Sequence, residues 1–434
     1  MAARNDRGEN QSQGKPLRVT NIRIMQRSFQ ETTASSDYSP ASLYVADAAG
    51  LRTLAERLQP ALAADPRLAF DTEFIRERTY KPVLEIIQVS TADGFIAILD
   101  VPALKGELGI MRDLFLDPSV VKILHAGGQD MEILASHLGA PPTPVYDTQV
   151  AAAFAGYSLQ TGYGALVQAL LGVRLAKDEG FADWSRRPLS PAMRDYAEND
   201  VRYLHTLHDK LSAILEKRGR TGWASDQMLR SLLAGTEELP PEELWRKVGG
   251  KNVLDGRGLA ILRELSAWRD AEARRRDKPR RSVVKDDFLI EIARRAATDT
   301  HAIQTLRSAP PNLGEKNAQT LADTVRKGLD VPPEDRPQAD QSQPLDEQGS
   351  VLQEMLNTVV RLRAVEENLP PSLLASGDDL RALASERASP DFGGNLFAGW
   401  RGELVGKPLR DLLEGRLSIG YDPKRRRVVL ENTD

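Results

Sequence analysis

Short apolar runs rich in β-branched residues alternate with amphipathic helical patterns between residues 44 and 218. This alternation is typical of an α/β domain. The runs 68–74, 84–91 and 95–101 leave no room for a helix between the last two, so we expect an antiparallel meander. The run 121–125 follows a helical segment, and a crossover would place it parallel to a neighbouring strand. The sheet is therefore expected to be mixed.

The sequence after these strands predicts helices, the last of which is long. Ser190 suits the N-cap and Pro191 the first helical position, so we expect this helix to begin there. Tyr196 and Asp200 lie four residues apart within it. An apolar stripe continues the same helical pattern through Leu204, Leu207 and Leu211.

Strand signals fade beyond residue 219, and residues 236–325 and 350–425 each carry the pattern of several helices. Residues 326–349 are rich in proline, glutamine and acids, which is typical of a linker. Residues 1–40 are polar and lack the apolar core of a signal peptide, so we expect a disordered extension. The expected fold is an α/β domain with a mixed sheet over residues 41–218, followed by two all-α domains.

The composition excludes several kinds of functional site and partner. The 434 residues include no cysteine, which excludes disulfides, thiolate metal sites and cysteine nucleophiles and suits a reducing cytoplasm. The 58 basic and 62 acidic residues nearly balance, so a polyanionic partner would have to bind local basic patches. Charges interrupt the apolar runs well before the ~20 residues that a membrane-spanning helix needs. We therefore expect a soluble, cytoplasmic protein without a membrane partner.

Two carboxylates stand together in the run LAFDTEF. Asp71 and Glu73 are two residues apart on a predicted strand, so both face the same side of the sheet. Between apolar neighbours they would repel each other unless a divalent cation neutralised them. The ordinary alternative for an isolated D-x-E pair is that one acid simply faces solvent at the end of the strand.

Two further segments supply acids. Asp130 opens a helix after the Gly127-Gly128 turn, where it would either cap the helix or lie above the strand ends. Tyr196 and Asp200 share one face of the long helix. Alone, this pair is equally consistent with a tyrosine at the rim of the core and a solvated aspartate.

Taken together, the strand D-x-E, the helix-opening Asp and the helical Y-x-x-x-D resemble the three motifs of the DEDDy 3′-5′ exonucleases, whose fold is ribonuclease H-like. The stretches FDTEFIRERTYKPVLEIIQVS, LHAGGQDMEIL and ADWSRRPLSPAMRDYAENDVRYL are similar to bacterial ribonuclease D. The segments ELWRKVGG and LRELSAWRDAEARRRDKP resemble a helicase and ribonuclease D C-terminal (HRDC) domain, and NLFAGWRGELVG resembles a second one more loosely.

This resemblance implies a 3′-5′ exoribonuclease that trims tRNA precursors and other structured RNAs and releases nucleoside 5′-monophosphates. It implies two divalent ions, Mg²⁺ or Mn²⁺, which suit an all-oxygen site. Asp71 would bridge both ions, Glu73 and Asp200 would hold the one that activates water, and Asp130 would help to hold the other. Tyr196 would orient the water, because a tyrosine with a free pKa near 10 is a poor base at neutral pH.

Candidate RNA contacts are less specific. The family resemblance places Phe74 and Gln88 near the terminal nucleotide, although core packing explains Phe74 equally well. The loop before the catalytic helix offers three residues that either grip the RNA or are ordinary loop side chains: Lys177, Trp184 and Arg187.

Basic residues also gather at one end of a helix in the first helical domain. Few acids interleave there, so we expect phosphate contacts from Arg274, Arg275 and Arg276. The run 424–427 near the C-terminus is a weaker candidate. The expected partner is RNA with a free 3′ end, bound by a monomer. A DNA exonuclease with the same chemistry and a non-catalytic RNA-binding protein remain as alternatives.

Overall fold

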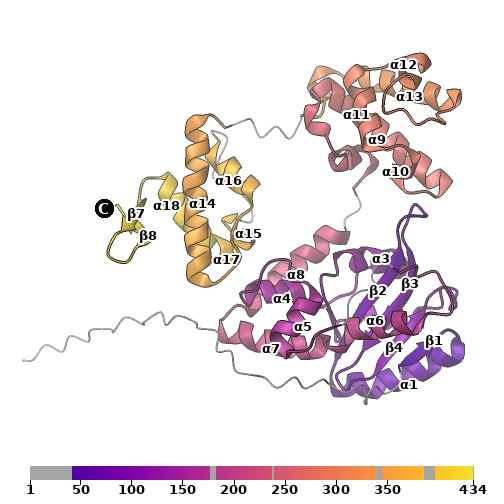
Figure 1. The fold of residues 1–434 in the computed structure, drawn as a ribbon, viewed down its shortest axis with the longest axis vertical. Coiled ribbons are helices and arrows are strands. Elements are labelled where there is room, and N and C mark those ends of the chain that lie inside the picture. The colour runs from indigo at the N-terminus through magenta and orange to yellow at the C-terminus, as the bar shows by residue number, and fades with distance from the viewer. Residues whose placement is uncertain (1–41, 176–181, 237–238, 339–344, 386–395, 434) are drawn as a thin grey trace, which may run out of the picture. The chain divides into compact units, whose positions relative to one another are not determined.

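The computed structural model describes residues 42–175, 182–236, 239–338, 345–385 and 396–433. The predicted disordered extension, residues 1–40, lies outside these ranges. The α/β domain contains a six-stranded sheet with the order β1-β4-β3-β2-β5-β6 (Figure 1). Its strands are β1 (Leu43–Val45), β2 (Arg67–Ile75), β3 (Val83–Ser90), β4 (Ile96–Asp100), β5 (Val121–Leu124) and β6 (Val145–Asp147).

The sheet is mixed, as the sequence predicts. Strands β2, β3 and β4 form the expected antiparallel meander, and β5 pairs with β2 in the parallel sense after a crossover through α2 (Gly109–Leu116). Strands β1 and β6 add parallel pairs at the two edges. The register of β2 against β3 shifts between Glu73 and Phe74, so the alternation of faces is interrupted directly after the second acid.

Helices cover both faces of the sheet. One face packs α1 (Ala48–Ala64), α2 and α3 (Gly128–Leu138) over a core that includes Leu54, Phe70 and Phe115. The opposite face carries Asp71 and Glu73 and is covered mainly by α6 (Pro191–Arg202). The helices α4 (Thr148–Phe154) and α5 (Tyr163–Leu171) follow β6.

The long helix predicted from residue 190 begins as expected but is broken. Ser190 caps α6 by accepting a hydrogen bond from the Met193 backbone N–H, and Pro191 occupies its first position. After Arg202 the chain turns at Tyr203, and α7 (Leu204–Lys217) begins. The expectation of one continuous helix is therefore wrong, because the hydroxyl of Tyr163 is inserted into the helical hydrogen-bond ladder at this point.

One further helix belongs to the α/β domain. Helix α8 (Thr221–Thr236) packs against α3 and α4, and its residues Met228 and Leu232 enter the cores of this domain. These contacts extend beyond the boundary predicted at residue 218.

The first helical domain begins after residue 238. It consists of η1 (Pro241–Lys247), η2 (Lys251–Val253), α9 (Gly256–Arg276), α10 (Arg280–Val283), α11 (Asp286–Arg295), α12 (Thr300–Gln304) and α13 (Glu315–Leu329). Its core centres on Trp245, Leu262, Phe288 and Leu321. A short η3 (Pro333–Asp335) lies in the segment predicted as a linker.

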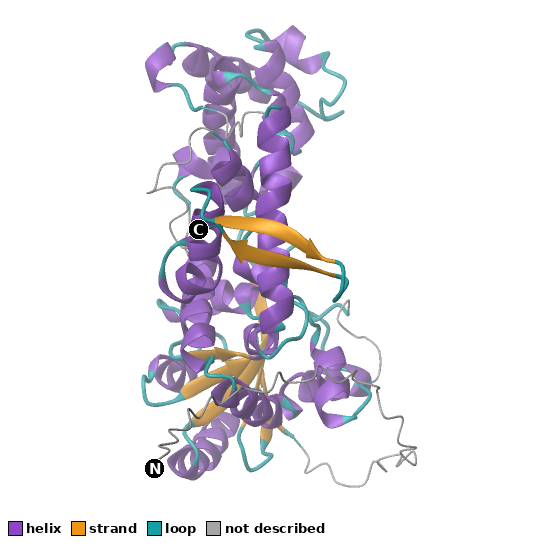
Figure 2. Ribbon diagram, turned by 90° about the vertical axis from the view of Figure 1, so that its left-hand side faces the viewer, coloured by secondary structure: helices purple, strands orange, loops and turns teal. Residues whose placement is uncertain are grey.

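The second helical domain contains α14 (Glu347–Glu367), α15 (Pro371–Leu374), α16 (Gly377–Ala384), α17 (Gly399–Arg401), the π-helical η5 (Gly402–Gly406) and α18 (Lys407–Leu413). It ends in an antiparallel hairpin of β7 (Leu417–Asp422) and β8 (Arg427–Asn432) (Figure 2). The hairpin adds a β element to a domain that was expected to be all-α, and it extends beyond the expected end at residue 425. Alternating apolar residues pack one side of the hairpin against the domain core: Leu417, Ile419 and Leu430.

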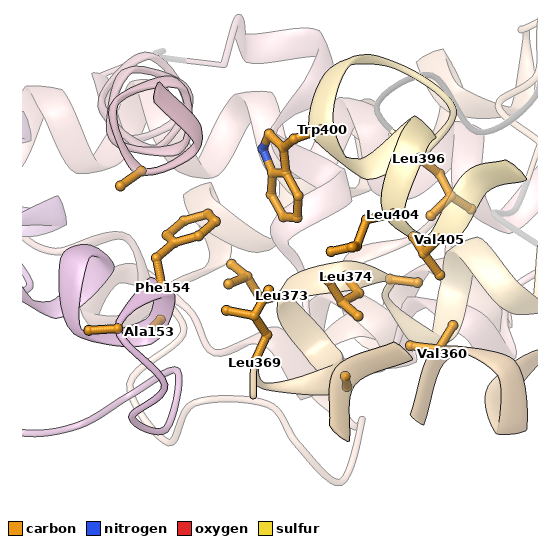
Figure 3. Close-up of a cluster of buried hydrophobic side chains, with 14 of the residues drawn as sticks. Ala153, Phe154, Val360, Leu369, Leu373, Leu374, Leu396, Trp400, Leu404 and Val405 are labelled. Carbon is orange, nitrogen blue, oxygen red and sulfur yellow. The ribbon is translucent and has the colours of Figure 1, made fainter. Parts of the chain in front are cut away.

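This second domain shares a hydrophobic cluster with α4 and α8 of the α/β domain. Trp400 meets Phe154 edge to face, with ring centroids 5.2 Å apart (Figure 3). Its other neighbour is Trp223, on which it stacks with ring centroids 5.3 Å apart. The guanidinium of Arg220 donates to the Phe154 carbonyl at 3.0 Å and to the Glu367 carbonyl at 2.6 Å. Within the described ranges, every helix is too short or too polar to cross a membrane.

Candidate active site

Three carboxylates converge where α6 crosses the sheet. Asp71 and Glu73 project from β2, and Asp200 projects from the last turn of α6. One carboxylate oxygen from each lies within 4.8 Å of the others, and all three side chains are half-buried. Helix α6 is fixed over this point because Met193, Ala197 and Val201 pack their apolar faces against the sheet.

The electrostatics of this cluster are unfavourable without a cation. Burial raises the pKa of the Asp71 carboxyl well above its ordinary value, and three neighbouring acids raise it further: Asp130, Asp200 and Glu73. Burial also raises the pKa of Glu73 to about 9, with added repulsion from Asp200 and Asp130. The protein thus holds together acids that repel one another, as expected of a site built for positive charge.

Asp130 lies outside this group of three but is close enough to act on it electrostatically. It is buried in the first turn of α3 and accepts a hydrogen bond from the Thr72 hydroxyl. Burial raises the pKa of Asp130, and the Thr72 hydrogen bond opposes that shift. Thr72 therefore ties Asp130 to the strand that carries Asp71 and Glu73.

The turn before Asp130 requires its glycine. A Cβ at Gly127 would lie 2.2 Å from the Leu124 side chain, which no larger residue could accept without movement. Ala126 adopts a left-handed φ of 57°, and its N–H donates to Asp147 at 3.0 Å. The close turn brings the start of α3, and with it Asp130, toward the end of β5.

Tyr196 lies one helical turn before Asp200 and is half-buried. Its ring centroid is 6.0 Å from that of Trp184 at an interplanar angle of 47°. Asp200 and Tyr196 therefore emerge from the same stretch of α6, as their spacing predicts.

The two predicted nucleotide contacts on β2 and β3 differ in their surroundings. Gln88 pairs directly with Asp71 across the strands and is fully buried, and neither atom of its side-chain amide has a hydrogen-bond partner among the described residues. Phe74 packs against the core on the other face and stacks with the Arg76 guanidinium at 5.0 Å. This packing favours the alternative in which most of the Phe74 ring belongs to the hydrophobic core and does not contact the terminal nucleotide.

The loop before α6 has a structural role wherever it is described. Trp184 is only 2% exposed and packs among Ile86, Ile98 and Met193. The Arg187 guanidinium forms a two-point ion pair with Asp100, with N–O distances of 2.5 and 3.0 Å. These contacts favour the alternative that Trp184 and Arg187 are ordinary loop side chains and do not grip the RNA. Lys177 lies outside the described ranges.

The basic end of α9 contains more acid pairing than the sequence suggested. The Arg274 guanidinium donates to Asp270 at 2.8 Å, and Arg275 and Arg276 both donate to Glu272. The expectation of few interleaving acids is therefore wrong, because these helix neighbours are three or four residues away. Arg275 remains the most exposed of the three, with 68% of its side chain accessible.

A tyrosine outside the predicted site joins this helix to the α/β domain. Tyr80, in the loop after β2, donates its hydroxyl proton to Asp270 at 2.7 Å and accepts from Arg280 at 2.8 Å. The guanidinium groups of Arg274 and Arg280 both lie 5.0 Å from its ring centroid. Arg274 therefore supports contact between these domains.

Sequence reasoning also missed Thr72 and Tyr163. Strand alternation places Thr72 on the face opposite to Asp71, but nothing in its spacing identifies Asp130 as its partner. Tyr163 begins α5, far from the motifs in sequence, and only the folded chain brings it to α6. His125 lies between Thr148 Oγ1, at 2.9 Å, and the Thr161 carbonyl, at 3.1 Å.

The donor set fits a hard divalent cation. Carboxylate oxygens are the preferred protein ligands of Mg²⁺ and Mn²⁺, and three of them lie within 4.8 Å of one another beside a fourth buried acid. The raised pKa values of Asp71 and Glu73 show the repulsion that such an ion would relieve.

Comparisons with known proteins agree with this geometry. A 3′-5′ exonuclease family model matches residues 44–216, and an HRDC domain model matches residues 258–325. Ribonuclease D of Granulibacter bethesdensis is 35% identical over 370 residues, which span 85% of this chain and 92% of that protein. Ribonuclease D of Sphingobium indicum is 36% identical over 376 residues, which span 85% of this chain and 94% of that protein.

A solved structure matches most of the chain as well. Escherichia coli RNase D, described as an exoribonuclease involved in structured RNA processing, has a TM-score of 0.76 to this structure at 30% sequence identity. The match covers 86% of this chain and 99% of that one. The chain therefore belongs to the ribonuclease D family and is a 3′-5′ exoribonuclease.

Proposed function

We propose that this enzyme trims the 3′ extensions of tRNA precursors and other structured RNAs with the help of two divalent ions, Mg²⁺ or Mn²⁺. The observation that carries the proposal is the convergence of Asp71, Glu73 and Asp200 within 4.8 Å. The structured-RNA role described for the Escherichia coli relative supports the substrate class.

In this proposal Asp71, Glu73 and Asp200 hold the ions, and Asp130 completes the acidic site. When bound, the ions would lower the pKa of the attacking water and neutralise charge on the phosphate and the departing oxygen. The water oxygen forms a bond to phosphorus while the bond from phosphorus to the 3′ oxygen breaks. The products are a nucleoside 5′-monophosphate and an RNA shortened by one nucleotide with a new 3′ hydroxyl.

The remaining side chains position these groups. Tyr196, one turn before Asp200, orients the attacking water through its hydroxyl. Thr72 keeps the Asp130 carboxylate in place. Gln88, with its amide buried beside Asp71, is the strongest candidate among the proposed contacts to the terminal nucleotide. Phe74 contributes at most the exposed part of its ring.

The two helical domains would bind the body of the RNA, with residues 350–425 acting as a second HRDC-like domain. Arg275 is the most exposed arginine of the α9 cluster and is the clearest phosphate contact. We further propose that the enzyme acts as a monomer in the cytoplasm.

A time course on a tRNA carrying a 3′ extension tests the proposal. With Mg²⁺ the extension should shorten one nucleotide at a time and release nucleoside 5′-monophosphates, and with EDTA it should stay intact. A DNA strand of the same sequence and a tRNA with a blocked 3′ end serve as matched substrates. Equal digestion of the DNA would favour a DNA exonuclease, and RNA binding without mononucleotide release would favour a non-catalytic RNA-binding protein.

A further inference from the structure

Tyr163 occupies an unusual place in the interrupted helix. In a continuous helix the Tyr203 N–H would donate to the carbonyl four residues earlier, which belongs to Asn199. Instead the Tyr163 hydroxyl lies between these groups. It donates to the Asn199 carbonyl at 2.8 Å and accepts from the Tyr203 N–H at 3.2 Å. A side chain from α5 thus replaces one backbone hydrogen bond of the helix.

The replaced bond spans the turn that contains Asp200. Asn199 and Tyr203 flank the last turn of α6, so the Tyr163 hydroxyl acts on the backbone of the turn that carries Asp200. On the side of the sheet, the Ser90 hydroxyl donates to the Val201 carbonyl at 2.9 Å, and the Ser90 carbonyl lies 3.0 Å from His205 Nε2. The break between α6 and α7 is therefore fixed from two sides, by Ser90 of β3 and by Tyr163 of α5.

Tyr163 itself is firmly placed. Its ring packs among apolar residues next to Val201 and Leu204 and meets the His125 ring edge-on, with centroids 5.5 Å apart. Burial raises the pKa of its hydroxyl, and the charges of Asp200 and Asp71 raise it further. The electrostatic influence of these two carboxylates therefore reaches the hydroxyl that lies at the helix break.

We infer that Tyr163 is a positioning residue for the metal site, because its hydroxyl fixes the turn that directs Asp200 toward Asp71 and Glu73. Without that hydroxyl, the Tyr203 N–H and the Asn199 carbonyl could bond to each other, and the turn at Asp200 would relax toward a continuous helix. The inference rests on the metal site proposed above.

The test compares Tyr163→Phe with Tyr146→Phe. Tyr146 is a matched control because it packs against the same cluster as Tyr163, but its hydroxyl accepts a hydrogen bond from Ser212 of α7, at 3.1 Å, and not from the backbone of the break. Mn²⁺ affinity is measured by calorimetry on the RNA-free protein, and kcat and KM are measured on a short single-stranded RNA.

Tyr163→Phe should weaken Mn²⁺ binding or lower kcat by about 10–100-fold, the usual effect of losing a group that orients a metal ligand, with KM unchanged. Tyr146→Phe should match the wild type in all three quantities. Wild-type Mn²⁺ affinity and kcat in Tyr163→Phe would overturn the inference. Loss of folding in Tyr163→Phe, seen by circular dichroism in EDTA, would overturn it too, because the hydroxyl would then serve the fold.

A double variant distinguishes action through Asp200 from action elsewhere. Asp200→Asn alone should lose most Mn²⁺ affinity and activity, and adding Tyr163→Phe should change neither further. Additive losses would place the effect of Tyr163 outside Asp200 and overturn the inference. If the wild type binds no Mn²⁺, the proposed metal site fails, and the kcat comparison alone then decides whether Tyr163 positions Asp200.

Discussion

Thr72 and Asp130 connect two motifs of the proposed active site through a single hydrogen bond. Thr72 stands between Asp71 and Glu73 on β2, yet its side chain points to the other face and donates to the Asp130 carboxylate at the start of α3. Both residues are buried. The strand that supplies two carboxylates therefore also fixes a third.

Replacing Thr72 by valine should lower kcat by about 10–100-fold while the protein stays folded, because valine keeps the shape but releases Asp130. Thr72→Ser keeps the hydroxyl and should retain most activity. Single-turnover rates on a 3′-labelled RNA make the comparison. Full activity in Thr72→Val would mean that Asp130 needs no such support.

Glu73→Gln should stabilise the metal-free protein while abolishing activity. The pKa of Glu73 is raised from 4.5 to about 9, so the folded state retains a proton that the unfolded chain releases. The free energy of unfolding of the wild type therefore falls as pH rises between about 4.5 and 9. Glutamine does not ionise, so the variant does not lose stability in this way. The difference in free energy of unfolding between the variant and the wild type should therefore grow from pH 6 to pH 9.

Thermal unfolding in EDTA measures this effect. A stabilisation of about 1 kcal/mol would raise Tm by roughly 2–4 °C for a domain of this size. With added Mn²⁺ the wild type should have the higher Tm, because only the wild type keeps the full set of proposed ligands. A variant that melts below the wild type in EDTA at pH 9 would contradict the raised pKa of Glu73.

Tyr196→Phe should reduce kcat but leave Mn²⁺ affinity unchanged, whereas Asp71→Asn should remove both activity and metal binding. The difference follows because Tyr196 orients the attacking water and Asp71 is a metal ligand in the proposed mechanism. Calorimetry and mononucleotide release separate the two effects. Equal loss of metal affinity in both variants would assign Tyr196 a different role.

Charge reversal at Arg275 and Arg276 should weaken RNA binding and reduce the slope of log affinity against log salt concentration by roughly 2. Arg274 is left unchanged because it contacts Asp270 and Tyr80. Reversal at Arg257, exposed near the other end of α9, is the control. Fluorescence anisotropy at several salt concentrations gives both values, and an unchanged slope would show that these arginines bind only Glu272.

Trp400→Ala should destabilise the folded chain by about 3–5 kcal/mol, because it leaves a cavity between Phe154 and Trp223. Trp400→Phe fills most of that space and should cost much less. Urea denaturation followed by circular dichroism compares the variants. Similar midpoints for alanine and wild type would show that the second helical domain contributes little to the stability of the α/β domain.

The sequence predicted best those elements that depend on patterns within a few neighbouring residues. The meander, the crossover to β5 and the start of α6 were predicted because strand alternation, loop length and an N-cap each act within a few residues. Asp71, Glu73 and Asp200 could be named from their motifs, although only the fold places them within 4.8 Å of one another.

The features that were not predicted depend on contacts between distant segments. The break after α6 requires Tyr163, and the burial of Trp184 and the pairing of Arg187 require β3 and β4. The C-terminal hairpin was not predicted, because its two strands are only six residues long and are separated by a short basic turn. In each case the outcome depends on contacts between segments that are far apart in the sequence.

The order of the proposed metal-site residues along the chain has a consequence during synthesis. Asp71 and Glu73 leave the ribosome early, but Asp200 follows only after the whole sheet and most of its helices. A nascent chain can therefore complete its acidic cluster only when α6 settles onto the strands. Until then, the growing polypeptide lacks a working nuclease centre beside the messenger and ribosomal RNA that surround it.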